Sequence, residues 1–538
     1  FADQQETIKY LGHVDQNHQN AVAVFADDGE KFGVWPETKL NVFDRGWLRQ
    51  LFDMLAANES WIKMVTPSEV LDSVAPIGKV YLPEGSYREM TEWVLPPDQL
   101  AEYEQARREL EPDPRWPRIA RFVRGGFWRN FKVRYPETNE MYSRMMMVSR
   151  RLQNLADSGV GGELIRAARR ELYRGQCNCT YWHGAFGGTY LPHLRNAVYN
   201  HLIAADNLLD NAVGRRGPWI EATSDDFNFD GRPEVSLAND KLISLIAPAR
   251  GGQMYELDVR SICHNLLATL SRRPEAYHRR VLAGPNGAGG SVIDASAPAK
   301  FKQPGLEHRV QYDAYSRKSL VDHFYDDTAA LAAVARGDVP ERGDFLGLPF
   351  EARVRRNPSR IRVQLTRDGN AWGVPLKITK LITLSAGSDA LEIAYAIDGL
   401  PPDRSMHFAV EFNFAGLPAG ADDRYFHNGN GENGSRLGRL ETQLSLTDAE
   451  ELSLADEWLG IDVGLFFSRP TNIWTYPIET VSQSEGGFEL VHQSVCVTPH
   501  WHIQGDDAGR WTVTMRLALD TSMAESRANQ PPALAVHG

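Results

Sequence analysis

The sequence predicts two fold classes in one chain, an α/β part followed by an all-β part. Three observations support this: short apolar runs alternate with helical patterns in residues 1–95, helical patterns recur from residue 139 to about residue 210, and apolar residues alternate with polar ones after about residue 217. We therefore expect the C-terminal part of an incomplete barrel of β/α units, then a helical region, then a large antiparallel β-sandwich at residues 217–525. A loose tail is expected at residues 526–538.

The first expected strand is the apolar run at residues 21–25, which is followed by Asp27, Asp28, Gly29 and Glu30. A short run closed by Asp-Gly is typical of a buried strand that ends in a tight turn. Acids at the carboxyl end of a barrel strand face the mouth of the barrel, where catalytic groups gather. Neighbouring carboxylates resist ionising together, so we expect one acid to have a raised pKa, as a general acid requires. An ordinary hairpin turn and part of a cation site are the alternatives.

Further elements in this part follow the order strand, helix, strand, helix. Residues 5–14 and 46–57 have helical patterns, and residues 62–65 predict a short strand. Another helix is expected from Pro67, with Ser68 as its N-cap. That order indicates the last part of a parallel barrel or sheet.

The middle of the chain is predicted to be helical. Residues 139–156 and 163–173 carry helical periodicity. Residues 118–134 are basic with interleaved aromatic residues, a pattern also found in nucleic-acid-binding proteins. We interpret it as a structured lead-in to the next helix, because the whole chain has a net charge of −12.

Residues 176–195, with the sequence QCNCTYWHGAFGGTYLPHLR, precede a helix that is expected to run to about Asp210. Cys177 and Cys179 together with His183 are compatible with a zinc site. A tetrahedral structural site needs four ligands, however, and no second ligand pair stands at short spacing. The zinc interpretation is therefore the weaker one.

The second half of the chain shows the alternation of half-buried strands. Apolar residues recur at every second position in residues 408–414 and 511–519, and residues 477–482 and 486–501 predict further strands. One short helix is expected at residues 327–336, where alanine dominates. Gly, Asp and Pro turns separate the segments, which is typical of an antiparallel sandwich.

A possible cation loop stands at the start of this region. Asp226, Asn228 and Asp230 supply oxygen atoms at positions 1, 3 and 5, glycine stands at position 6, and Glu234 stands at position 9. Position 12 is Leu237 rather than the bidentate Glu of an EF-hand. A structural calcium site and a plain Asx turn both remain open.

Composition limits the function classes. The net charge of −12 argues against nucleic acid as a partner, because phosphate binding needs a positive surface. No run of 18 apolar residues occurs, so we expect no membrane span. Four cysteines are too few for a disulfide scaffold, and a reduced, cytoplasmic protein is expected.

Two segments resemble conserved regions of glycoside hydrolase family 57, in its α-amylase/4-α-glucanotransferase branch. FADDGEKFGVWP, at residues 25–36, resembles the fourth conserved region, and CNCTYWHGAFGGTYLPHLR, at residues 177–195, resembles the fifth. The resemblance implies a (β/α)7-type catalytic barrel that ends near residue 95. It also implies that residues 96–216 complete the active site and that a C-terminal sandwich follows.

The resemblance implies roles for the acidic segment. Asp28 corresponds to the acid/base catalyst of a retaining mechanism. The nucleophile is expected to be a Glu on an earlier barrel strand, upstream of Phe1, which is not a Met and which suggests a missing N-terminal part. Asp27, Glu30 and Trp35 are expected to bind substrate, the last two beside the −1 and +1 sugar sites.

The second segment is expected to contribute to the same substrate site. Trp182 matches a sugar-stacking tryptophan, and His183 lies in the same loop. Cys179 stands where many family members have an Asp, so a polar contact made by that Asp is not expected here.

The implied function is a retaining enzyme, either a 4-α-glucanotransferase or an α-amylase, that acts on α-1,4-glucan or malto-oligosaccharides. The sequence does not separate hydrolysis from transfer. No cofactor is required for this chemistry, a structural calcium ion is possible, and a homodimer is possible. One alternative is a non-catalytic carbohydrate-binding fragment that lacks the nucleophile. Another is a metal-dependent hydrolase built on the acidic cluster, which a chelator would inactivate.

Overall fold

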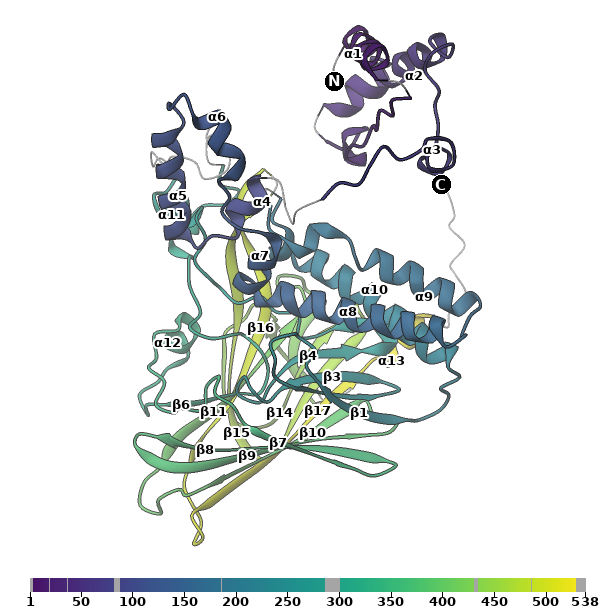
Figure 1. Ribbon diagram of the computed structural model, residues 1–538. Coiled ribbons are helices and arrows are strands. Elements are labelled where there is room, and N and C mark those ends of the chain that lie inside the picture. Colours follow the sequence, from purple (N-terminus) through teal and green to yellow (C-terminus); the bar gives the residue numbers. More distant parts are fainter. Residues whose placement is uncertain are drawn as a thin grey trace, which may run out of the picture. The chain divides into compact units, whose positions relative to one another are not determined.

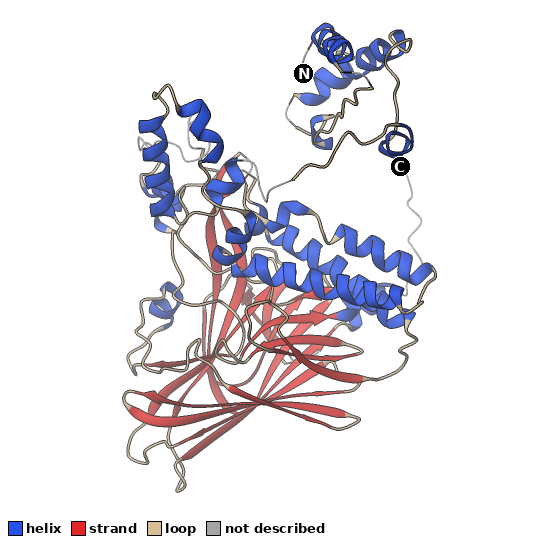
Figure 2. Ribbon diagram, viewed as in Figure 1, coloured by secondary structure: helices blue, strands red, loops and turns tan. Residues whose placement is uncertain are grey.

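The computed structural model describes residues 3–18, 20–35, 37–81, 88–184, 186–285, 300–429, 434–484 and 486–528. The chain divides into two units, Phe1–Glu84 and Gly85–Gly538, and each is described by itself (Figure 1). In the second unit most of the helices precede the strands along the chain. Figure 2 distinguishes the helices from the strands by colour.

The first unit consists of short helices joined by extended chain. Its elements are α1 (Gln4–Asn17), the 3₁₀ turn η1 (Gly29–Lys31), the π-helical turn η2 (Leu40–Asp44), α2 (Trp47–Ala57) and α3 (Pro67–Ser73). The helices predicted at residues 5–14 and 46–57 are confirmed as α1 and α2.

Helix α3 begins at Pro67, as predicted, but its N-cap differs from the predicted one. Its N-cap is Thr66 rather than Ser68, because the Thr66 hydroxyl accepts the Glu69 N–H at 3.3 Å. The Glu69 carboxylate in turn accepts the Thr66 N–H at 2.7 Å, which completes a capping box. Pro67 occupies the first helical position, where its missing N–H costs nothing.

The strands predicted at residues 21–25 and 62–65 are not formed. Residues 21–28 are extended but unpaired, and Val24 and Phe25 are 83% and 72% exposed. A strand is stabilised only by hydrogen bonds to a neighbouring strand, and the described residues before Ile220 form none. The sequence pattern was that of a strand, but the pairing that makes a strand is absent from this part of the structure.

The second unit opens with a helical region. Its α-helices are α4 (Arg88–Trp93), α5 (Pro97–Leu110), α6 (Trp116–Ile119), α7 (Trp128–Arg134), α8 (Pro136–Asp157), α9 (Glu163–Arg174) and α10 (Pro192–Ala212). The 3₁₀ turns in the same region are η3 (Ala120–Phe122), η4 (Asn178–Tyr181) and η5 (Gly188–Tyr190). Helices α8, α9 and α10 pack around a shared apolar core that includes Met141, Leu172 and Leu202. The helices predicted at residues 139–156 and 163–173 are confirmed.

The all-β part contains two antiparallel sheets. The smaller sheet has the order β1-β2-β3-β4-β5, with strands β1 (Ile220–Asp225), β2 (Glu234–Asn239), β3 (Leu242–Ala247), β4 (Gln253–Val259) and β5 (His264–Asn265). The larger sheet contains β6 (Val321–Tyr325), β7 (Glu351–Arg356), β8 (Arg360–Ala371), β9 (Val374–Ser385), β10 (Ala390–Asp398), β11 (Met406–Ala415), β12 (Arg424–Asn428), β13 (Ser435–Arg439), β14 (Leu444–Asp456), β15 (Ile461–Ser484), β16 (Gly487–Ile503) and β17 (Arg510–Asp520). Its main path runs β13-β12-β14-β15-β17-β10-β9-β8-β7, and β16, β11 and β6 branch from β15 in that order.

The two sheets share one apolar core, to which Leu237 of the smaller sheet and Ile382 and Leu465 of the larger one belong. Strand β17 buries alternate residues and exposes those between them, as predicted for residues 511–519. The helix expected at residues 327–336 is α12 (Leu331–Arg336). Helices α11 (His278–Leu282) and α13 (Ser522–Ala528) were not predicted. Most of the predicted tail, residues 529–538, lies outside the described residues.

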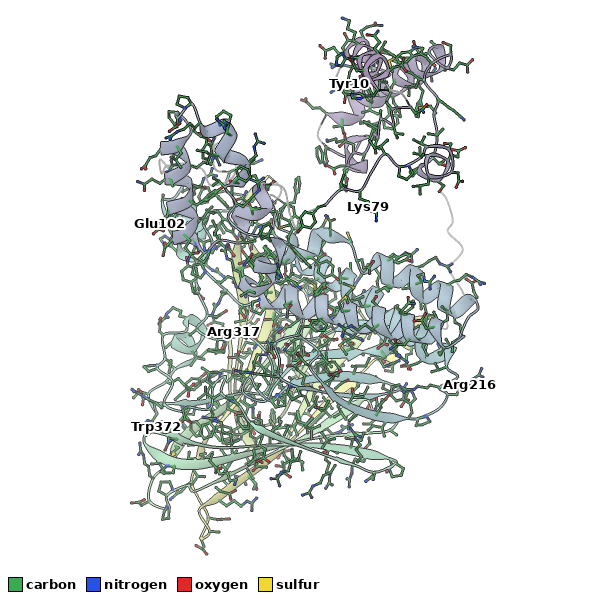
Figure 3. All side chains as sticks on the ribbon, viewed as in Figure 1. Tyr10, Lys79, Glu102, Arg216, Arg317 and Trp372 are labelled. Carbon is green, nitrogen blue, oxygen red and sulfur yellow. The ribbon has the colours of Figure 1, made fainter. Side chains whose placement is uncertain are left out.

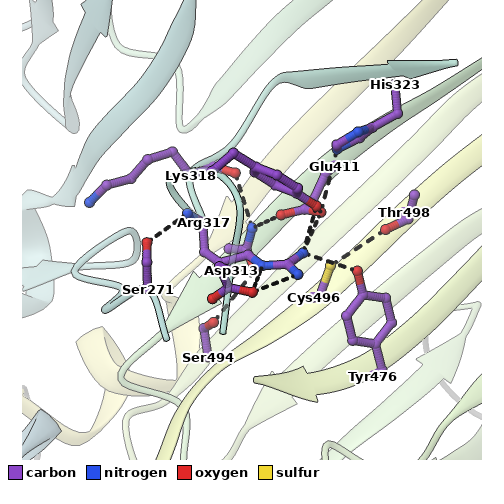
Figure 4. A network of polar contacts seen from close by, with 12 residues as sticks. Ser271, Asp313, Arg317, Lys318, His323, Glu411, Tyr476, Ser494, Cys496 and Thr498 are labelled. Atoms are coloured by element: carbon purple, nitrogen blue, oxygen red, sulfur yellow. Dashed lines mark hydrogen bonds and ion pairs between the residues drawn. The ribbon is translucent and has the colours of Figure 1, made fainter. Parts of the chain in front are cut away.

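A network of buried charges also joins the strands of the larger sheet (Figure 4). Arg317, labelled in Figure 3, is 1% exposed. It donates to Asp313 and to Glu411 on β11, each at 2.8 Å (Figure 4). Burial opposes the charge on the Glu411 carboxylate, but Arg317 and His323 lower its pKa to about 2. Because every charge in this network has a buried partner, we assign it to holding the strands together.

Candidate active site

The acidic turn of the first unit brings its predicted site residues into one short, exposed segment. Asp28 is the N-cap of η1, and its carbonyl oxygen accepts the Lys31 N–H at 3.2 Å. The Trp35 N–H donates to the Glu30 carbonyl at 3.0 Å, and the Lys31 ammonium lies 5.6 Å from the centre of the Trp35 ring. The Asp27, Asp28 and Glu30 side chains all face solvent.

Asp27 does not have the raised pKa that we expected from neighbouring acids. A hydrogen bond from the Lys31 ammonium, followed by one from the Asp28 N–H at 2.9 Å, lowers the pKa of Asp27. Lys31 lies four residues after Asp27, within reach of its carboxylate. The local cation therefore outweighs the repulsion between the acids at Asp27.

The second predicted segment forms a loop between η4 and α10. Trp182 is extended and partly exposed, and its carbonyl oxygen accepts the Thr189 N–H at 2.9 Å. Gly188 has a φ of +44°, and a Cβ atom there would lie 2.0 Å from the Trp182 carbonyl oxygen. Gly184 has a φ of +61°, and its Cβ would lie 2.7 Å from the Trp182 indole. These two glycines let the loop fold tightly around Trp182.

His183 is 1% exposed, so its ring is not available for the direct substrate contact that we expected. The ring stacks on Trp93 with centroids 3.9 Å apart and planes 11° apart. Its Nδ1 lies 2.7 Å from the Gly184 carbonyl, which only accepts, so Nδ1 carries the proton. Burial lowers the pKa of His183 to about 4. His183 therefore packs beneath the loop as a neutral side chain.

A buried carboxylate, Glu275, supports the same loop and was not found from the sequence. It accepts hydrogen bonds from the Tyr190 hydroxyl at 2.7 Å, the Tyr135 hydroxyl at 2.8 Å and the Arg134 guanidinium at 2.6 Å. Burial opposes its charge, but Arg134 and the other donors hold the pKa of Glu275 below its ordinary value. No local pattern marks this residue, because its partners lie 85 to 141 residues away.

Arg195, at the end of the second motif, ties the loop to the sandwich. Its guanidinium donates at 2.6 Å to the Thr189 carbonyl and at 2.6 Å to the Gln493 side chain on β16. The Gln493 amide donates to the Tyr190 carbonyl at 2.8 Å. The loop that presents Trp182 is therefore fixed from below by buried polar groups.

The loop predicted as a possible calcium site has the geometry of the Asx-turn alternative. The Asp226 carboxylate accepts the N–H groups of Asp230 and Gly231 at 3.0 and 2.9 Å. Glu234 accepts the Asn228 N–H at 3.2 Å and its side-chain amide at 2.7 Å. Burial raises the pKa of Glu234 to about 7. Calcium binding here stays a prediction.

Metal ligation by the cysteines is not supported either. Cys177, Cys179, Cys263 and Cys496 form no disulfide with one another, and the first two are exposed. Over the described part of the chain, no three His, Cys, Asp or Glu side chains are grouped so that they could hold a metal ion. None of the described helices is long and apolar enough to cross a membrane.

Comparison with known proteins gives matches along nearly the whole chain. The model "Glycosyl hydrolase family 57" matches residues 1–83. The models "Alpha-amylase/4-alpha-glucanotransferase, middle domain" and "Alpha-amylase/4-alpha-glucanotransferase, C-terminal" match residues 126–209 and 226–515.

Two relatives and one solved structure illustrate the similarity. A 4-alpha-glucanotransferase of Thermococcus kodakarensis is 33% identical over 507 residues, which are 94% of this chain and 70% of the relative. Alpha-amylase 1 of Dictyoglomus thermophilum is 31% identical over 522 residues, 96% of this chain and 72% of the relative. The crystal structure of the Thermococcus litoralis 4-alpha-glucanotransferase aligns with a TM-score of 0.70 at 31% identity, over 96% of this chain and 70% of that one.

Proposed function

Because the chain belongs to glycoside hydrolase family 57, in its α-amylase/4-α-glucanotransferase branch, we propose that it acts on α-1,4-glucosidic bonds with retention of configuration. The observation that carries this proposal is the fixed loop around Trp182. The backbone of this loop is held by buried polar groups, so it loses little freedom when a sugar ring stacks on the indole, and the loop is preorganised for a glucan.

Asp28 is the proposed acid/base. In the first step its carboxyl proton goes to the departing glycosidic oxygen while the C1–O bond breaks and the nucleophile bonds to C1. In the second step the Asp28 carboxylate removes a proton from the attacking group, which then displaces the nucleophile from C1. Water as the attacking group gives hydrolysis, and a sugar 4-hydroxyl gives transfer. The nucleophile stays a prediction, because no described acid is assigned to it.

Trp35 and Trp182 are the proposed sugar-stacking residues, and Asp27 and Glu30 are proposed to bind sugar hydroxyls. We also propose that residues 21–25 are a strand of the family's (β/α)7-type barrel, which forms when neighbouring strands pair with it. The exposure of Val24 and Phe25 supports this, since side chains of this type are normally covered.

The remaining parts of the proposal concern the surroundings of the enzyme. Four cysteines that form no disulfide with one another are compatible with a reducing compartment, so we propose a cytoplasmic location. We also propose that the chain forms a homodimer and that residues 226–234 bind a calcium ion. Sedimentation of the purified chain tests the first, and calcium titration followed by calorimetry tests the second.

The test of the activity is product analysis with maltoheptaose. We expect shorter malto-oligosaccharides alone from hydrolysis, and longer ones as well from transfer. Replacing the acid/base in Asp28→Asn is expected to lower kcat by roughly 10²–10⁴, the usual contribution of a positioned acid/base. Asp53→Asn, on the exposed side of α2, is the matched control.

Less than a tenfold loss in Asp28→Asn would remove Asp28 from this role. Binding of maltoheptaose by the unchanged chain without any product would instead favour the non-catalytic carbohydrate-binding alternative. Loss of activity with a chelator would favour the metal-dependent hydrolase.

A further inference from the structure

A hollow of about 530 Å³ opens on the larger sheet, in a part of the sandwich that the proposed activity does not use. It lies where the pairing of β14 with β15 shifts register twice, on either side of Ala449. Its volume is in the range of pockets that hold small molecules. The lining side chains that matter here are Asp448, Arg469, Asn472, Trp501, Trp511 and Thr514.

Two tryptophans form the apolar part of the hollow. Trp501 and Trp511 are 5% and 7% exposed, and their ring centroids are 5.4 Å apart with planes tilted by 55°. The Trp501 indole N–H donates to the Thr471 hydroxyl at 3.0 Å, and the Arg469 guanidinium lies 5.0 Å from the centre of the Trp511 ring. Both indoles are therefore held in place at the hollow.

Several polar groups of the hollow make no hydrogen bond or ion pair with the described part of the protein. Within the described residues, no hydrogen bond or ion pair is made by the Asp448 carboxylate, the Asn472 side-chain N–H₂ or the Arg469 guanidinium. Asp448 and Asn472 are adjacent, because the Asp448 N–H donates to the Asn472 side-chain oxygen at 3.4 Å. Asp448 also has a φ of +51°, a conformation that is costly for a residue other than glycine.

The chemistry of these groups selects a ligand class. One carboxylate and one guanidinium balance each other, so the hollow suits a neutral ligand rather than an ion. A carboxylate beside an amide N–H₂ offers an acceptor next to a donor, which matches adjacent hydroxyls of a sugar ring. Trp501 and Trp511 supply apolar lining for its C–H groups.

We propose that this hollow is a second glucan-binding site. That the sugar is an α-glucan rests on the proposed function, whereas the preference for a neutral polyol rests on the side chains themselves. The site binds the polymer without cleaving it and holds a glucan chain on the enzyme.

The second site is separate from the loop that presents Trp182. Both contact strand β15, since a Cβ at Gly187 would lie 3.2 Å from the Gln483 carbonyl, while Asn472 lines the hollow. The stretch of β15 between Asn472 and Gln483 spans roughly 35 Å at the usual rise of a strand. A sugar in the hollow therefore does not block a sugar at Trp182.

The test is affinity electrophoresis of the whole chain in native gels that contain increasing glycogen. We expect Asn472→Ala and Asp448→Ala each to raise the dissociation constant for glycogen at least about fivefold, as expected for lost hydrogen bonds to the ligand. Arg516→Ala is the matched control, because Arg516 is a half-exposed residue of β17 that does not line the hollow. Trp182→Ala is expected to remain retarded by glycogen.

Unchanged retardation of both Asn472→Ala and Asp448→Ala would overturn the proposal. Complete loss of retardation in Trp182→Ala would overturn it as well, because binding would then depend on the Trp182 loop alone. The proposed activity is tested separately, by the formation of products from maltoheptaose by the unchanged chain.

Discussion

The acidic turn at residues 27–35 is held by contacts within itself, whereas the loop at residues 182–190 is held by side chains from distant parts of its unit. In the turn, the carboxylate of Asp27 is bound by Lys31, and every acid is exposed. In the loop, Glu275 accepts a hydrogen bond from the Tyr190 hydroxyl, and Gln493 donates one to the Tyr190 carbonyl. Contacts with distant residues therefore hold the second motif of the family in the described structure, whereas the first motif is held only by its own neighbours.

The largest expected effect comes from removing the charge beneath the loop. Glu275→Gln leaves the Arg134 guanidinium and two tyrosine hydroxyls with a neutral partner in a buried site. We expect it to lower the free energy of unfolding by about 3 kcal/mol, as for other broken buried pairs. Urea unfolding followed by circular dichroism measures this.

The same exchange in the acidic turn is the control. Glu30→Gln alters an exposed carboxylate, so we expect a change in the free energy of unfolding within about 0.5 kcal/mol. Equal effects of the two substitutions would contradict the distinction between the loops.

The pH dependence of stability sharpens the comparison further. The pKa of His183 is about 4 in the folded chain, below its ordinary value of 6.5. Between these two values the unfolded chain binds a proton that the folded chain excludes. The contribution of His183 is therefore fully present above pH 6.5 and is lost as the pH falls towards 4, by about 3 kcal/mol at most.

Urea unfolding at several pH values between 4 and 7 measures this dependence. His183→Phe has no proton to exclude, so its free energy of unfolding should vary less with pH than that of the unchanged chain. Identical pH dependence of the two chains would show that other groups account for it.

Two glycines extend the comparison to the backbone. Gly188→Ala places a Cβ 2.0 Å from the Trp182 carbonyl at a positive φ, so we expect a loss of roughly 1–3 kcal/mol in the free energy of unfolding. Gly29→Ala, in the acidic turn, meets no atom within 4 Å and has no positive φ, so we expect a change within about 1 kcal/mol. The measurement is thermal unfolding of both variants. An equal loss in both would mean that the loop is no tighter than the turn.

The local parts of the fold were predictable from the sequence. The apolar spacing of residues 46–57 and the alternation of residues 511–519 appear directly as α2 and β17, because each pattern depends only on residues close together in the chain. The family was also identified correctly from two short segments. The domain boundaries and the roles of the site residues stay predictions.

The errors arose where distant residues decide the outcome. Residues 21–25 have a strand pattern, but pairing depends on other strands. The pKa of Asp27 follows its neighbour Lys31 rather than the number of acids. Glu275 was missed because its hydrogen-bond donors lie far away along the chain. The burial of His183 depends on Trp93, which no spacing in the motif indicates.

The bond between Gln493 and Tyr190 spans 303 residues of sequence, and this sets the timing of events during synthesis. A ribosome that adds about 5–20 residues per second needs roughly 15–60 s to make the chain between them. During that interval the aromatic loop has left the ribosome without the strand that completes its support. The nascent chain therefore spends this time with Trp182 and its neighbours open to chaperones and to other unfolded chains.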